Sequence, residues 1–305
     1  MKRPIAGRSS FRHKHRVDAA FAVLTIAPTV LLVFICSFLP VAKSIYLSFL
    51  DFKLSRAYQS LWNNFQNYKE ILAQGDLVAA VKVTLVFVAV VVFLQLCLGL
   101  LLALILNSRI HGRRLARSLV LLPWVIPTVI TALLWNWLYQ PQYGLINYVL
   151  LKTGLIASPA SWLADVKLAL PSVMVTALWK QLPLMALMLL AGLQSIPVEM
   201  YEAARMDGAG ALQSLRFITL PFLRSVIRTT VMISIILNFK QFPLFWIMTG
   251  GGPIDATTTL AIYSYKSAFV NLDFGKGAAI ATLWLVLLVA VYLGFNRLFK
   301  INEVE

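Results

Sequence analysis

Six long apolar runs constrain the fold of this chain more than any other feature of the sequence. They lie at 18–40, 83–106, 118–138, 169–194, 223–248 and 275–299. Each is close to the ~20 residues that an α-helix needs to cross a bilayer. Backbone groups in lipid must pair internally, and the alternation typical of barrel strands is not seen, so each run is predicted to be helical. With 60% hydrophobic and 13% charged residues, the chain is predicted to be an all-α integral membrane protein with six transmembrane helices.

The distribution of Lys and Arg predicts the orientation of these helices. One set lies in the arm 1–17, in or beside the loops 107–117 and 195–222, and near the tail 300–305: Lys2, Arg3, Arg8, Arg12, Lys14, Arg16, Arg109, Arg113, Arg114, Arg117, Arg205, Arg216, Arg224, Arg228, Arg297 and Lys300. The smaller set lies in or beside segments 41–82, 139–168 and 249–274: Lys43, Lys53, Arg56, Lys69, Lys82, Lys152, Lys167, Lys266 and Lys276. Cytoplasmic loops carry the excess of positive charge, so both termini are predicted to be cytoplasmic.

The formal net charge of +15 would also suit a nucleic-acid-binding protein. Its distribution between alternate loops favours membrane topology as the cause. We therefore expect membrane lipid, and no nucleic acid, among the partners.

Residue patterns that carry catalysis are not found in the sequence. The fragment Gly275-Lys276-Gly277 lacks the hydroxyl residue and the preceding glycine of an ATP-binding P-loop. His13, His15 and His111 lie in basic segments, where neighbouring cations would repel a metal ion. We expect no enzyme activity, no cofactor and no metal.

The predicted cytoplasmic loop contains an unusual stretch, Glu199 to Pro221. A helix is predicted from Glu199 to Met206, then a bend at Asp207-Gly208, because glycine readily takes the left-handed conformation that ends helices. A second helix is predicted over 211–217, closed by Leu220-Pro221 before the next span. Acidic residues and few large apolar side chains favour a protein partner over lipid, because the cytoplasmic leaflet is anionic.

This stretch resembles a known motif. Glu202-Ala203-Ala204, Asp207-Gly208-Ala209 and Ile218-x-Leu220-Pro221 resemble the EAA loop of permease subunits of bacterial ABC importers. The segments Gln194-Ser195-Ile196-Pro197 and 249–253 narrow the resemblance to the maltose-type family of sugar permeases. It covers essentially the whole chain from residue 18 onward.

The resemblance implies a function and a set of partners. The EAA loop would dock on an ATPase subunit, with Glu202 as the polar anchor, Ala203 and Ala204 giving close packing and Gly208 providing the bend. The residues themselves indicate that Glu202, Arg205 and Asp207 supply charge for orientation. The resemblance also implies a location in the bacterial inner membrane, two ATPase copies, a second permease subunit and an extracytoplasmic binding protein that delivers a sugar, polyol or sugar derivative.

A polar row lies in the fifth apolar run. Ser234, Asn238 and Gln241 are spaced i, i+4 and i+7, which places them on one helix face. Hydrogen bonding between helices and contact with a transported substrate both explain such a row. The resemblance favours the second explanation, because maltose-type permeases place substrate contacts at corresponding positions.

Two lysines lie within the apolar runs. Lys180, beside Gln181, and Lys240 are costly at membrane depth and should face a cavity, a partner or a substrate. With Gln181, they are candidates for the substrate pathway, and they raise the hypothesis of a substrate with an acidic group. The alternative is that both lysines snorkel or contact backbone carbonyls.

A secondary transporter or channel working without ATP is the rival function. It predicts ion-coupling carboxylates within the spans, and no Asp or Glu lies deep in any of the six runs.

Overall fold

The computed structural model describes residues 21, 23–55, 61–108 and 111–299. Five helices are long and apolar enough to cross a membrane, or six if one bent pair counts as a single span. The predicted all-α membrane class is confirmed. The predictions for the arm 1–17 and the tail 300–305 lie outside the described residues.

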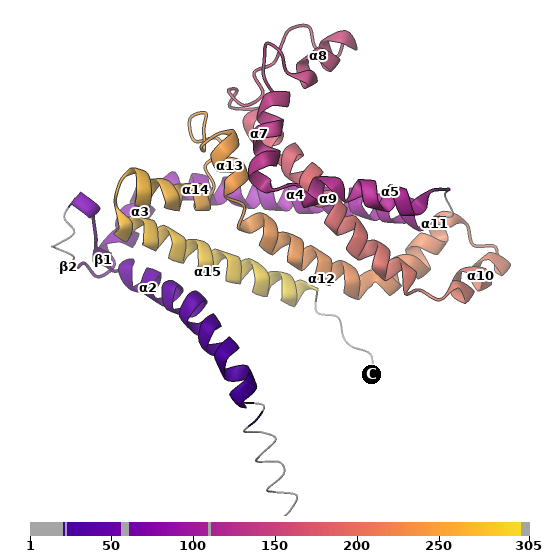
Figure 1. The fold of residues 1–305 in the computed structure, drawn as a ribbon, viewed down its shortest axis with the longest axis horizontal. Coiled ribbons are helices and arrows are strands. Elements are labelled where there is room, and N and C mark those ends of the chain that lie inside the picture. The colour runs from indigo at the N-terminus through magenta and orange to yellow at the C-terminus, as the bar shows by residue number, and fades with distance from the viewer. Residues whose placement is uncertain (1–20, 22, 56–60, 109–110, 300–305) are drawn as a thin grey trace, which may run out of the picture.

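Four long helices form the body of the molecule, and they run roughly along one direction (Figure 1). They are α4 (Asp76–Asn107), α9 (Ala169–Gln194), α12 (Leu220–Phe239) and α15 (Phe274–Leu298). The most extensive packing is between α4 and α9, and α12 packs against both. The apolar core lies between these helices and shorter ones around them.

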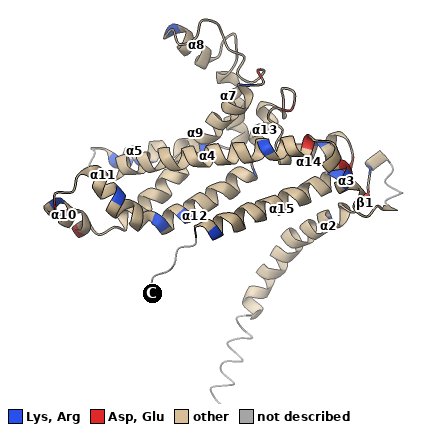
Figure 2. Cartoon of the chain, turned by 180° about the vertical axis from the view of Figure 1, so that it is seen from behind, with Lys and Arg blue, Asp and Glu red and all other residues tan. Residues whose placement is uncertain are grey.

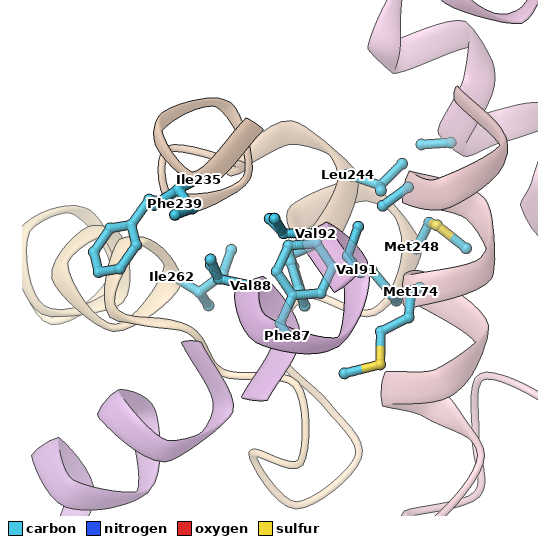
Figure 3. Packing of buried hydrophobic residues seen from close by; sticks show 14 of the residues in the cluster. Phe87, Val88, Val91, Val92, Met174, Ile235, Phe239, Leu244, Met248 and Ile262 are labelled. Atoms are coloured by element: carbon cyan, nitrogen blue, oxygen red, sulfur yellow. The ribbon is translucent and has the colours of Figure 1, made fainter. Parts of the chain in front are cut away.

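The central cluster of that core joins six helices (Figure 3). α4 contributes four side chains from successive turns, and α7 (Thr128–Leu138), α9, α12, α13 (Pro243–Met248) and α14 (Leu260–Tyr265) close around them. The labelled residues are Phe87, Val88, Val91, Val92, Met174, Ile235, Phe239, Leu244, Met248 and Ile262. Dense packing of this kind fixes the relative positions of α4, α9 and α12.

The N-terminal helix Val23–Leu47 diverges from the body (Figure 1). It includes the π-helical turn η1 (Phe34–Phe38) and ends in α2 (Leu39–Leu47), which packs against α15. In the most apolar 18-residue stretch of this helix, no residue is buried. Such an apolar surface requires lipid or another protein around it.

Small elements cover the end of the body at which α4 begins. β1 (Leu50–Asp51) pairs antiparallel with β2 (Leu61–Trp62), and α3 (Gln66–Ala73) follows. The rings of Phe49, Trp62, Phe65 and Tyr68 form an aromatic cluster there.

The third apolar run is sharply bent. α5 (Arg113–Val120) and α6 (Leu122–Val125) precede α7 (Thr128–Leu138), and the bend between the two parts is 92°. Ile126 is extended, with ψ 130°, as expected for a residue that precedes a proline. Beyond α7 lies α8 (Leu145–Lys152).

The fifth apolar run differs from the prediction at both ends. The expected closure at Leu220-Pro221 is wrong, because α11 (Ala211–Ser214), η3 (Leu215–Thr219) and α12 form one uninterrupted helix. The π-helical turn explains this: the amide of Leu220 donates to the carbonyl of Leu215, and the changed spacing accommodates the proline ring. At the other end α12 stops at Phe239, and Pro243 begins α13.

The two ends of the body differ in charge (Figure 2). Acidic residues gather near α3, α14 and the π-helical turn η4 (Lys266–Val270) that follows α14. Every ion pair among the described residues lies at this end. The end formed by α5, α11 and the start of α12 is mainly basic, and its acidic residues lie on or beside α10 (Val198–Met206).

Candidate coupling loop and polar network

The charged loop folds as a helix, a bend and a second helix, as predicted. α10 follows the extended residue Pro197, and Glu199 lies in its first turn, where an acid is favourable. Gly208 has φ +81°, and the amide of Ala209 donates to the carbonyl of Ala204 over 2.8 Å. Glycine at the left-handed position therefore ends α10.

Most of the predicted coupling residues face solvent. Glu202, Ala203, Asp207 and Gly208 are exposed, and Ala204 is half-buried. The Tyr201 hydroxyl lies 3.0 Å from Thr219 Oγ1, which ties α10 to the helix that follows. α10 thus presents small and charged side chains, and its position is fixed by this contact.

A polar network joins α4, α9 and α12 at the centre of the body. Ser234 Oγ donates to Gln95 Oε1, and Asn238 Nδ2 donates to the same oxygen over 3.2 Å. Gln181 Nε2 donates to Asn238 Oδ1 over 3.3 Å. Gln95, Ser234 and Asn238 are buried, while Gln181 is half-buried.

Two atoms of this network lack partners among the described residues. They are the donor Gln95 Nε2 and the acceptor Gln181 Oε1. An unpaired buried polar group costs ~1–3 kcal/mol. The network therefore has capacity for a ligand that offers both an acceptor and a donor, as a hydroxyl group does.

A crevice of only about 10 Å³ lies between α9 and α12 beside this network, and its lining includes Gln181, Leu184, Met188, Ile233 and Ser234.

Gln241 does not join the predicted row. Because α12 ends at Phe239, Gln241 lies in the irregular link to α13 and is half-buried there. Only Ser234 and Asn238 share the helix face. Lys240 caps the end of α12 and is exposed, so it does not face the network from within the helix.

Lys180 is buried at the bend of the third run. Its Nζ donates to the carbonyl of Ile126, a group outside the regular bonding of α6 and α7. For Lys180, the structure thus shows contact with a backbone carbonyl, which was the alternative to binding an acidic substrate. The lysine thereby holds the bend against α9.

Gln95 was missed by the sequence reasoning. It is the strongest hydrogen-bonding side chain in the run 83–106, and an amide in so apolar a helix is itself a signal. Its role depends on contacts with residues about 140 positions away, which helical spacing within one run does not reveal.

Comparisons with known proteins agree with this geometry. Residues 95–300 match the family described as "Binding-protein-dependent transport system inner membrane component". The chain is 36% identical to the trehalose/maltose transport system permease protein MalF of Thermococcus litoralis, over 92% of this chain and 95% of that protein. It is 32% identical to the sulfoquinovosyl glycerol transport system permease protein SmoG of Agrobacterium fabrum, over 94% and 92%.

A solved structure shows the same fold. It is that of a bacterial ABC transporter involved in the import of the acidic polysaccharide alginate, with a TM-score of 0.80 and 21% identity over 96% of this chain and 100% of that chain.

Proposed function

The chain belongs to the family of binding-protein-dependent transport system inner membrane components and is a permease subunit of an ABC importer, and we propose that its cargo is a sugar. Named relatives carry trehalose and maltose or sulfoquinovosyl glycerol. The permease has no ATPase of its own, because hydrolysis in such importers belongs to a separate subunit.

The observation that carries the proposed cargo is the unpaired donor and acceptor in the network of Gln95, Gln181, Ser234 and Asn238. Amide and hydroxyl groups recognise sugar hydroxyls without needing charge on the ligand. If α9 and α12 separate along the crevice between them, hydroxyl groups of the sugar would pair with these two atoms. Lys240 and Gln241, which follow α12, would then lie at the mouth of this pathway.

Transport is proposed to be coupled to ATP hydrolysis through α10. Glu202 would anchor the loop on the ATPase, Ala203 and Ala204 would allow close approach, and Asp207 with Gly208 would set the exit angle. The exposure of these side chains and the fixed position of α10 support this.

The complete importer is proposed to contain a second permease, two ATPase subunits and an extracytoplasmic binding protein. The chain offers one wall of a pathway, and helix Val23–Leu47 leaves a large apolar surface uncovered. Both termini are proposed to lie in the cytoplasm. An ATP-independent transporter is disfavoured by the family and by the absence of acidic residues in the described parts of α9, α12 and α15.

An acidic cargo is the second candidate, favoured by the lysines in the apolar runs. Lys180 already donates to Ile126, so exposed Lys240 is the remaining cation for an acid group. The uncharged network supports a neutral sugar more directly.

Uptake in proteoliposomes tests this function. The complex would be assembled with both ATPase copies, the second permease and the binding protein. Asn238→Ala and Gln95→Leu should each lower ATP-dependent uptake by about fivefold or more, since each removes ~1–3 kcal/mol of contacts to buried polar groups. The exposed residue Thr229 on the same helix provides the control, Thr229→Ala, with unchanged uptake.

Two outcomes would contradict the proposal. One is sugar uptake that proceeds without ATP. The other is wild-type uptake in both network variants.

A further inference from the structure

A second cavity lies far from the polar network, where α4 begins and α14 passes beside it. Its volume is about 430 Å³, within the ~300–1,000 Å³ typical of ligand sites. The side chains that matter for recognition are Asp76, Trp246, Asp255, Tyr263, Lys266 and Asn271. We call it the α4–α14 pocket.

The loop that borders this pocket is held rigidly. Thr258 Oγ1 donates to Asp255 Oδ1 over 2.7 Å, and Lys266 Nζ lies 3.0 Å from the same oxygen. These two bonds hold the pKa of Asp255 below its usual range. A Cβ at Gly251 would lie 2.4 Å from Thr258 Oγ1 and 2.9 Å from Lys266 Nζ, so only glycine fits beneath them.

The charge of the pocket disfavours an anionic ligand. Lys266 is neutralised by Asp255, which leaves the carboxylate of Asp76 without an ion-pair partner among the described residues. An anion would be repelled by Asp76. A hydroxyl group can donate to it in a charge-assisted hydrogen bond.

The remaining groups suit a sugar ring. The indole of Trp246 is fixed by Tyr265, whose ring centroid is 4.6 Å away, and by Phe242, stacked at 5.9 Å. In the described part of the chain, no hydrogen bond engages the Tyr263 hydroxyl or the side-chain amide of Asn271. The pocket thus combines a rigid aromatic surface with unused donors and acceptors, as small-molecule sites do.

We propose that the α4–α14 pocket binds a neutral sugar ring at the entry end of the permease, before the sugar reaches the polar network. This proposal rests on the proposed sugar-import function. Trp246 supplies the apolar surface, and Asp76, Tyr263 and Asn271 bind hydroxyl groups. Asp76, Trp246 and Tyr263 lie on the helices α4, α13 and α14, which makes it a pre-formed site rather than one assembled on binding.

Site-specific labelling in the assembled complex tests the pocket directly. The free cysteines Cys36 and Cys97 would first be replaced by alanine. Val270 lines the pocket, so maleimide labelling of Val270→Cys reports occupancy without removing a proposed contact. Gln74→Cys, exposed at the same end but outside the lining, is the matched control.

The probes are maltose, trehalose and diacetylchitobiose, with digalacturonate as an anion. The neutral sugar that drives uptake should slow labelling at Val270→Cys at least fivefold and leave Gln74→Cys unchanged, and digalacturonate should not protect. With Asp76→Asn or Trp246→Leu, protection should need about tenfold more sugar. Asp76→Asn should also raise the transport KM while the maximal rate stays near wild type, which structural damage would not do.

The outcomes separate the two proposals. If a sugar is taken up but leaves labelling of Val270→Cys unchanged, the pocket assignment is wrong and the import function stands. If none of these saccharides drives uptake, the proposed sugar function fails and the pocket assignment falls with it. Protection by digalacturonate as strong as by neutral sugars would also overturn the assignment.

Discussion

At the residue scale, Lys180 shows how a charged side chain can belong inside an apolar helix without meeting a substrate. The bend at Ile126 frees a carbonyl from helical bonding, and the lysine on α9 donates to it. The cost of placing the amine at depth is offset by satisfying a buried acceptor. The residue joins two elements that the chain itself separates by more than fifty positions.

Replacing Lys180 with methionine should therefore destabilise the protein. The change leaves the Ile126 carbonyl unpaired at a cost of about 1–2 kcal/mol, which thermal unfolding in detergent would detect as a lower Tm. Exposed Lys240→Met should change stability by less than about 0.5 kcal/mol. An unchanged Tm for Lys180→Met, together with selective loss of acidic-sugar uptake, would instead support the substrate role that its sequence position suggests.

At the element scale, the coupling loop depends on one left-handed residue. Gly208 has φ +81°, and nothing lies within 4 Å of a Cβ built there. A side chain at this position meets no steric obstacle and is disfavoured only by the backbone conformation. The angle at which α10 ends is thus encoded by a single glycine.

Gly208→Ala should weaken coupling. The left-handed conformation costs an ordinary residue roughly 1–2 kcal/mol, so α10 should shift and sugar-stimulated ATP hydrolysis should fall several-fold. Gly210→Ala is the matched control, because the backbone there is extended, at φ −74° and ψ 173°, and the new Cβ would come no closer than 3.7 Å to Gln213. Equal effects of the two substitutions would show that flexibility, rather than the left-handed turn, matters.

The elements also show what could be predicted from sequence. Apolar run length predicted the all-α membrane class, and the Asp207-Gly208 signal predicted the bend of the coupling loop, because both depend on local chemistry. The break after Phe239 and the continuity through Pro221 were not predicted, since packing and a π-helical turn decide them. Only part of the polar network was predicted. The shared face of Ser234 and Asn238 follows from helical spacing, but their partner Gln95 comes from a helix that is distant in sequence.

At the scale of the whole molecule, the unequal charge of the two ends should fix the orientation in the bilayer. Met206, 89% exposed on α10, belongs to the mainly basic end, and Gln74 lies at the opposite end. In a chain freed of Cys36 and Cys97, Gln74→Cys should react with an impermeant maleimide in intact spheroplasts. Met206→Cys should react only after the membrane is opened, because segments rich in Lys and Arg are generally retained in the cytoplasm. The reverse pattern would show that both termini face outward.

The uninterrupted helix Ala211–Phe239 has a mechanical consequence. Its 29 residues span roughly 40 Å at ~1.5 Å per residue, and it carries Thr219, tied to α10, near one end and Asn238 near the other. Tilting a continuous helix of this length by about 5° displaces its far end by roughly 3 Å. That displacement is the length of one hydrogen bond, enough for a push at the loop to make or break the contacts of the network.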